Sequence, residues 1–171
     1  MVILFVGMRG SGKTTAAKKM AEKFDNTFIV DLYNEHEGDI IRRLDKTPNE
    51  GKKRIREEAT DTKKLFSTLK KLNNNFILIE DATIIFNAQI FDEGVKRLII
   101  ASRHKNNTIG FIFHSLQRIP LFIWEQSNYL NLFKTNDTTQ SFNRLGNKEL
   151  EEIYLDIKAS KDPHKNKILI L

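Results

Sequence analysis

The sequence predicts an α/β protein with a doubly wound, mainly parallel sheet. Short apolar runs alternate with amphipathic stretches along most of the 171 residues, and this alternation is typical of βαβ units. The first apolar run leads into a glycine-rich loop, and a later one ends in two adjacent acidic residues. Both features follow a predicted strand directly, and open α/β sheets bind their ligands at the carboxyl ends of the strands.

Composition indicates a single domain over residues 1–171, because a chain of this length most simply builds one core. No cysteine is present, so no disulfide framework or cysteine-based metal site is predicted, and a cytoplasmic setting fits. We expect neither a signal peptide nor a transmembrane segment, since no apolar stretch approaches the roughly 18–20 residues that span a bilayer. The net charge of +6 favours an anionic partner such as DNA. An AT-rich genome explains the abundant Lys, Asn and Ile equally well.

The glycine-rich loop follows a buried-strand pattern at residues 2–6 and satisfies the spacing G-x-x-x-x-G-K-[ST]. The residues expected to bind nucleotide are Gly7, Met8, Arg9, Gly10, Ser11, Gly12, Lys13, Thr14 and Thr15. Glycines let the backbone amides face an anion, and a helix that begins near Lys13 adds its positive end. We expect Lys13 to reach the β- and γ-phosphates of ATP and the Thr14 hydroxyl to bind Mg²⁺. The motif therefore predicts a P-loop NTPase sheet, and we expect one that resembles the RecA or ASCE kind.

The next segment carries two regular elements and then loses its pattern. A helix over 14–24 and a strand over 27–30 are predicted from their apolar spacing. Asp31 ends that strand, and we interpret it as a loop-capping residue, with a functional role as the alternative. Residues 34–60 mix acids and bases, so we expect an irregular charged insertion with a short helix near 39–44. A solvated insertion is favoured there over contacts with DNA phosphates.

A second nucleotide motif is predicted after a helix over 61–72. Four apolar residues at 76–79 form a buried strand, and Glu80 and Asp81 follow directly. This arrangement matches the Walker B motif, in which one carboxylate holds the Mg²⁺ shell and another orients or deprotonates the attacking water. Behind a complete P-loop, the acidic pair indicates nucleotide hydrolysis.

The rest of the chain continues the alternation of helices and strands. The predicted elements are a helix at 91–103, a strand at 108–113, a short helix at 121–126, a strand at 129–133, a polar stretch at 134–143, a helix at 147–159 and a strand at 167–171. Polar residues after 108–113 would lie beside the γ-phosphate if that strand neighbours the first one. We interpret Gln117 as a phosphate sensor or water-positioning group, and His114 as a structural histidine.

Four segments together resemble the FtsK–HerA superfamily of DNA-pumping ATPases. They are residues 7–14, 76–81, 103–104 and 111–120. The likeness is greatest to viral genome-packaging ATPases and to the ATPase domains of zonula occludens toxin-like phage proteins, and it covers most of the chain outside 34–60. It implies an ATP- and Mg²⁺-dependent ring, a hexamer, that moves DNA with a capsid or portal partner, in the host cytoplasm or associated with virions.

The resemblance also implies roles for single residues. The superfamily's strand-tip glutamine is a sensor, which maps onto Gln117. An arginine ahead of the same strand reaches the γ-phosphate of a neighbouring subunit; Arg103 occupies this place, with Arg97 as second candidate and a plain surface charge as the alternative. The superfamily's usual order in the second motif is Asp then Glu. The reversed order here implies that Glu80 holds Mg²⁺ through water and that Asp81, one methylene shorter, is the catalytic base.

Two other classes of function stay open. The glycine-rich loop also suits a small-molecule kinase of nucleoside, nucleotide or shikimate type, in which Asp31 and the basic residues of 42–56 would serve the acceptor and the lid. The acidic pair and Gln117 favour the ATPase. A nucleotide switch without turnover is the third class, and the intact Lys13, Thr14 and acidic pair make it unnecessary.

Overall fold

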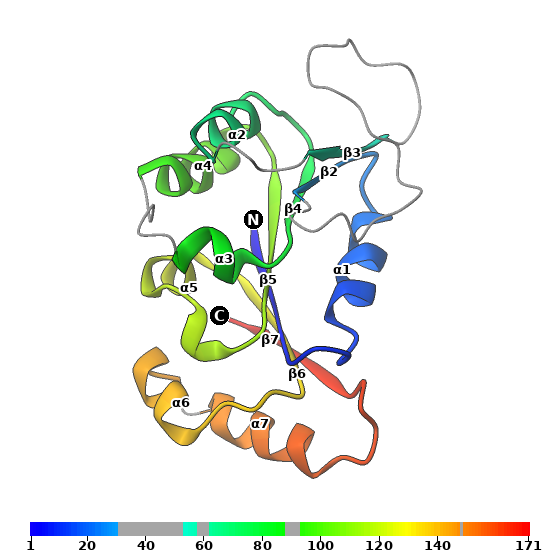
Figure 1. Cartoon of the computed structure of the whole chain (residues 1–171), viewed down its shortest axis with the longest axis vertical. Helices are drawn as coiled ribbons and strands as arrows, with labels where there is room; N and C mark the ends of the chain where they lie inside the picture. Colours follow the sequence, from blue (N-terminus) through cyan, green and yellow to red (C-terminus); the bar gives the residue numbers. More distant parts are fainter. Residues whose placement is uncertain (31–52, 58–61, 88–92, 148) are drawn as a thin grey trace.

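The computed structural model describes residues 1–30, 53–57, 62–87, 93–147 and 149–171. These residues form a seven-stranded sheet in the order β3-β2-β4-β5-β1-β6-β7 (Figure 1). The strands are β1 (Val2–Val6), β2 (Asn26–Val30), β3 (Lys53–Glu57), β4 (Phe76–Ile79), β5 (Thr108–Phe113), β6 (Tyr129–Phe133) and β7 (Asn166–Ile170). β7 pairs antiparallel with β6, and the other neighbouring strands pair in parallel. The predicted mainly parallel α/β fold is confirmed.

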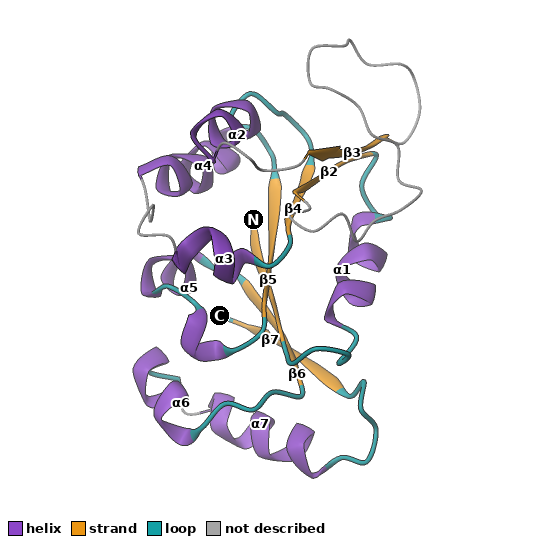
Figure 2. Ribbon diagram, in the orientation of Figure 1, coloured by secondary structure: helices purple, strands orange, loops and turns teal. Residues whose placement is uncertain are grey.

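Helices cover the two faces of the sheet unequally (Figure 2). They are α1 (Lys13–Ala21), α2 (Thr62–Leu69), α3 (Ala82–Asn87), α4 (Glu93–His104), α5 (Leu121–Gln126), α6 (Thr139–Leu145) and α7 (Glu149–Ala159), with a 3₁₀ turn η1 at Leu116–Arg118. In the described part of the chain, α1 packs alone on one face, and the other helices lie on the opposite side. The helix that follows the P-loop is therefore a layer of its own.

Two hydrophobic cores correspond to these two layers. On the side of α1, Ala17 and Ala21 lie buried against Ile3 and Phe5 of β1. Small alanine side chains let the helix approach the sheet closely. The larger core on the other side joins β1, β4 and β5 to α2, α4, α5, α6 and α7. Strands β1, β4 and β5 are buried along their whole length, which explains why they read as continuous apolar runs.

One strand lies within the segment that was expected to be irregular. Residues 34–60 were predicted as a charged insertion, but β3 occupies Lys53–Glu57 and pairs with β2 at the edge of the sheet. The sequence K-R-I-R-E holds a single apolar residue, so no periodicity reveals the strand. Charged residues are common in edge strands, which pair on one side only. The helix expected near 39–44 and Asp31 lie outside the described residues.

Two short helices were also not predicted. α3 follows the acidic pair directly, and α6 occupies much of the stretch that was expected to be polar and irregular. Helices of this length are stabilised by tertiary packing rather than by intrinsic propensity. In α6, Phe142 is buried and its ring lies 4.9 Å from that of Tyr154 in α7. Gly146 then ends the helix with a φ of 68°.

Candidate active site

The P-loop lies over the carboxyl ends of three adjacent strands. It leaves β1 at Val6, and its first residues bond to both neighbouring strands. Gly7 N donates to Phe113 O of β5 at 3.1 Å, and Met8 N donates to Lys134 O, just after β6, at 2.8 Å. These bonds hold the base of the loop from both sides, so its position follows that of the sheet.

Gly7 is required at this place because there is no room for a side chain. A Cβ atom on Gly7 would lie 2.6 Å from Phe133 Cβ and 2.6 Å from Ser11 Oγ. Both distances are shorter than any ordinary contact between such atoms. The first glycine of the motif therefore allows the loop to pack against β6.

Lys13 and Thr14 begin α1 and face the inside of the loop. The Lys13 side chain is buried, and its Nζ donates to Met8 O at 3.2 Å. Gly12, just before the helix, has a φ of 93°, in the left-handed region that favours glycine. An ammonium group and a helix N-terminus thus meet beside the loop, which suits a polyphosphate.

A cavity of about 530 Å³ opens beside the P-loop, within the usual size range of ligand sites. Its lining residues come from the loop, the start of α1 and the ends of β4 and β5: Arg9, Gly10, Lys13, Thr14, Glu80, Asp81, Ile112 and His114. Both nucleotide motifs predicted from the sequence therefore meet in one cavity. β5 lies between β1 and β4, so its tip separates the P-loop from the acidic pair.

The two acidic residues leave β4 in different ways. Glu80 is buried, and its backbone N donates to Val30 O at 3.1 Å, which prolongs the pairing of β4 with β2. Asp81 has a φ of 43°, a left-handed conformation that aspartate tolerates better than most residues. This turn brings Asp81 Oδ1 to 2.5 Å from Nε2 of His114. The left-handed conformation of Asp81 thus allows a side-chain hydrogen bond between the ends of β4 and β5.

The surroundings of Asp81 keep its carboxyl group ionised. The hydrogen bond from His114 is the largest influence and lowers the pKa of Asp81 below its usual value. Partial burial opposes this effect, while the positive charges of His114, Lys13 and Arg9 lower the pKa further. An ionised Asp81 can accept a hydrogen bond from a water molecule in the cavity.

His114, rather than Gln117, is the residue of the β5 tip that lines the cavity. Sequence analysis interpreted His114 as structural. Gln117 lies three residues further on, in η1, with an exposed side chain and a backbone N that donates to Ser115 Oγ at 3.1 Å. The condition for a strand-tip role, that β5 neighbours β1, is met. The signal that could have identified His114 is its position as the first residue after the strand.

A buried carboxylate that sequence reasoning missed holds the turn after β5. Asp137 accepts hydrogen bonds from Ser115 Oγ at 2.6 Å, Leu116 N at 2.8 Å, Gln117 N at 3.3 Å, Ser141 Oγ at 3.3 Å and Thr135 Oγ1. Tyr154 of α7 also donates to the backbone carbonyl of Asp137 at 2.7 Å. Asp137 therefore ties the tip of β5 to the loop after β6 and to α6 and α7.

Arg103 lies away from the chain's own P-loop. It is close enough to the amino group of Met1 to help lower that group's pKa, after the larger effect of burial. Met1 precedes β1, so Arg103 is at the opposite edge of the sheet from the loop. Its Nη2 donates to Gln126 Oε1 at 2.8 Å on the surface. Arg97 is also exposed, on α4. An action of either arginine on a neighbouring subunit stays a prediction.

This fold and site define a P-loop NTPase. The chain belongs to the ATPase family associated with various cellular activities (AAA), because the model of that family matches residues 3–112. No curated protein matches the sequence. In the described ranges, no helix is long and apolar enough to cross a bilayer.

The whole fold is similar to that of a viral NTPase. The genome packaging NTPase B204 from Sulfolobus turreted icosahedral virus 2, in complex with AMP, matches with a TM-score of 0.75 and 17% identity over 99% of this chain and 92% of that chain. Its complex with ATP-gammaS gives 0.72 and 16% over 98% and 95%. B204, the DNA-packaging ATPase from Sulfolobus Turreted Icosahedral Virus, gives 0.72 and 15% over 98% and 95%. The expected resemblance to viral genome-packaging ATPases is confirmed at the level of the fold.

Proposed function

We propose that this ATPase is a DNA translocase that assembles into a ring and packages a viral genome. The observation that carries the proposal is the meeting of the P-loop and the acidic pair in one cavity, within a fold shared along the whole chain with a genome packaging NTPase. The net charge of +6 suits a partner with a phosphate backbone. Recruitment by a capsid or portal protein is part of the same proposal.

In the proposed site, the loop amides and Lys13 bind the β- and γ-phosphates of ATP. The residues present also suit Mg²⁺, because the Thr14 hydroxyl and the Glu80 carboxylate line the same cavity and offer the oxygen ligands that this ion prefers. Among the described residues, no cluster of three or more His, Asp or Glu forms a complete metal cage. This fits an ion that phosphates and water largely coordinate. When bound, it would supply positive charge to the phosphate oxygens.

Asp81 and His114 would place the attacking water. Asp81 accepts a hydrogen bond from the water and can take its proton as the bond to the γ-phosphorus forms in line with the leaving oxygen. Because the pKa of Asp81 is lowered, its main contribution is to orient the water rather than to act as a strong base. His114 holds the carboxylate in position through the 2.5 Å hydrogen bond. Gln117 stays a candidate sensor that would need to turn toward the phosphate.

The ring completes the proposed site. An arginine from the neighbouring subunit would stabilise charge on the transferring phosphoryl group, and such a residue raises the rate by roughly 10³–10⁵ in P-loop enzymes. Arg103 is the first candidate, because it is exposed at the edge of the sheet away from its own P-loop. ATP hydrolysis would then depend on assembly.

The first experiment measures phosphate release from ATP as protein concentration is raised, with and without DNA. The proposal predicts a specific activity that rises with concentration and is stimulated by DNA. A specific activity that changes neither with protein concentration nor with DNA would contradict the proposal. Small-molecule acceptors would then be screened for the alternative kinase activity.

A mixing experiment tests the arginine in trans. Lys13→Ala and Arg103→Ala should each be inactive alone, yet a mixture should regain activity, because some interfaces combine an intact Lys13 with an intact Arg103. Lys71→Ala removes an exposed cation after α2 and serves as the control that should behave as wild type. A mixture that stays inactive while both variants still assemble would remove Arg103 from this role.

A further inference from the structure

Because β7 runs antiparallel to β6, the loop before it lies at the end of the sheet where the P-loop lies. β7 begins at Asn166, which pairs with Phe133 at the carboxyl end of β6. The preceding loop, residues 160–165, therefore reaches the same edge as the P-loop. It connects α7 to β7 and contains His164.

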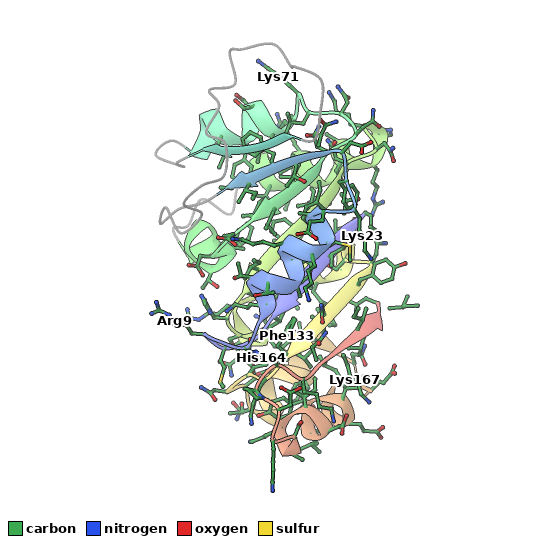
Figure 3. All side chains as sticks on the ribbon, turned by 90° about the vertical axis from the view of Figure 1, so that its right-hand side faces the viewer. Arg9, Lys23, Lys71, Phe133, His164 and Lys167 are labelled. Carbon is green, nitrogen blue, oxygen red and sulfur yellow. The ribbon has the colours of Figure 1, made fainter. Side chains whose placement is uncertain are left out.

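His164 packs directly on the P-loop. A Cβ atom added to Gly12 would lie 3.2 Å from Nδ1 of His164 and 3.8 Å from Cε1 of Phe133. Figure 3 shows His164 beside Phe133 at this end of α1. His164 is exposed to solvent, and Nδ1 is the ring atom that approaches Gly12 most closely.

Several hydrogen bonds define the shape of this loop. His164 N donates to Asp162 Oδ1 at 2.8 Å, and Asp162 N donates to Ser160 Oγ at 3.2 Å. Lys134, the residue after β6, donates from Nζ to Ser160 O at 3.4 Å. The backbone carbonyl of Lys134 holds the base of the P-loop, so the histidine loop and the P-loop share one support.

His164 lies on the other side of the P-loop from the acidic pair. The cavity with Asp81 and His114 faces β4 and β5, whereas His164 precedes β7 and contacts Gly12. The γ-phosphate must lie near the groups that place water. A nucleoside triphosphate bound along the loop therefore directs its nucleoside away from β4, toward the start of α1 and the β6–β7 side.

We propose that His164 and the loop over 160–165 form the nucleoside subsite, in which the imidazole stacks on the base of the bound nucleotide. This inference rests on the nucleotide use proposed above, but not on DNA movement or ring assembly. Stacking needs an accessible planar side chain near the nucleoside end of the phosphate loop, and His164 offers an exposed imidazole beside Gly12.

Calorimetric titration with ATP and with inorganic tripolyphosphate tests this subsite. A ring that stacks on a base changes affinity by roughly 5- to 150-fold, so His164→Ala should weaken ATP binding about tenfold. Tripolyphosphate has no base, so its affinity should not change. His164→Phe keeps a planar ring and should keep most of the affinity for ATP. The control His104→Ala removes an exposed imidazole at the end of α4 and should affect neither ligand.

Two results would overturn the subsite. One is an unchanged affinity of His164→Ala for ATP. The other is an equal loss for ATP and tripolyphosphate, which would mean that His164 serves the phosphates or the shape of the loop. These outcomes are distinct from a failure of the proposed motor function, which would appear as DNA-indifferent hydrolysis by the wild-type protein while the difference between the two ligands persisted.

Discussion

Replacing His114 by alanine should slow ATP hydrolysis and leave ATP affinity nearly unchanged. The imidazole contacts the carboxylate of Asp81 at 2.5 Å, whereas Lys13 and Thr14, the residues proposed to bind the phosphates and Mg²⁺, lie at the start of α1. The substitution therefore removes the group that orients Asp81 while the P-loop stays intact. In kinetic terms, kcat should fall and KM should stay near its wild-type value.

The size of the effect follows from the geometry of this hydrogen bond. A hydrogen bond to a charged group contributes about 1.5–3 kcal/mol. The His114 side chain is 43% exposed and that of Asp81 is 22% exposed, so screening by water favours the lower end, about 1.5 kcal/mol. In the variant, Asp81 is no longer held in the ground state and must be oriented again in the transition state, and a cost of this size lowers kcat about tenfold.

The same substitution should change the response to pH. The hydrogen bond from His114 is the main cause of the lowered pKa of Asp81, so alanine raises that pKa toward its ordinary value. In the proposed mechanism an ionised Asp81 orients water, so the acid limb of the pH profile of kcat should move to higher pH. For stability, ionised Asp81 favours the folded state above its unfolded pKa of about 3.9. This contribution is lost as pH falls through the lower folded pKa, and it should be smaller in the variant.

Steady-state kinetics between about pH 3 and pH 7, a range that includes the ordinary pKa of aspartate near 3.9, would measure these effects, with thermal unfolding recorded at each pH. His114→Gln is the matched variant, because its amide can donate to Asp81 from nearly the same reach, and it should retain most of the activity. An unchanged kcat in His114→Ala, or a raised KM with unchanged kcat, would refute the role given to His114.

Two further predictions concern the support of the P-loop and are both measured by urea unfolding. Gly7→Ala should lower the free energy of unfolding by about 1–3 kcal/mol, because its methyl group would overpack against Phe133. At Gly10 an added Cβ would meet no atom within 4 Å, but the φ is 77°. Gly10→Ala should therefore lower the free energy of unfolding by about 1 kcal/mol through backbone strain alone. An equal or smaller loss in Gly7→Ala would contradict the packing argument. Asp137→Asn should lose about 3 kcal/mol, because an amide places a donor among buried donors. Exposed Asp156→Asn is its control and should change little, and equal stability of both variants would show that the Asp137 network contributes nothing.

The P-loop and the acidic pair could be predicted because each is encoded in consecutive residues. The spacing over 7–14 directly specifies a loop followed by a helix, and four apolar residues before Glu80 specify a strand with a carboxylate at its tip. The central strands β1, β4 and β5 were also predicted for a local reason: burial on both faces gives an uninterrupted apolar run.

The features that were missed depend on contacts between distant parts of the chain. His114 contacts Asp81, 33 residues earlier, through a left-handed backbone conformation at Asp81 that the sequence does not reveal. Asp137 binds partners on both sides of it in the sequence, without any regular spacing. β3 forms because β2 offers it a pairing edge, and its own residues show no strand pattern. Sequence patterns report local geometry, so these tertiary effects escape them.

Asp137 also affects how a conformational change at the P-loop can be transmitted to the rest of the protein. The carboxylate of Asp137 links the tip of β5 to α6, and its backbone bonds to the loop after β6 and to α7. Two of these segments, through Phe113 and Lys134, also hold the base of the P-loop. We expect this assembly to move as one stiff block. Under the proposed function, a shift caused by loss of the γ-phosphate would therefore be transmitted to the outer surface of α6 and α7, where a neighbouring subunit or DNA would receive it.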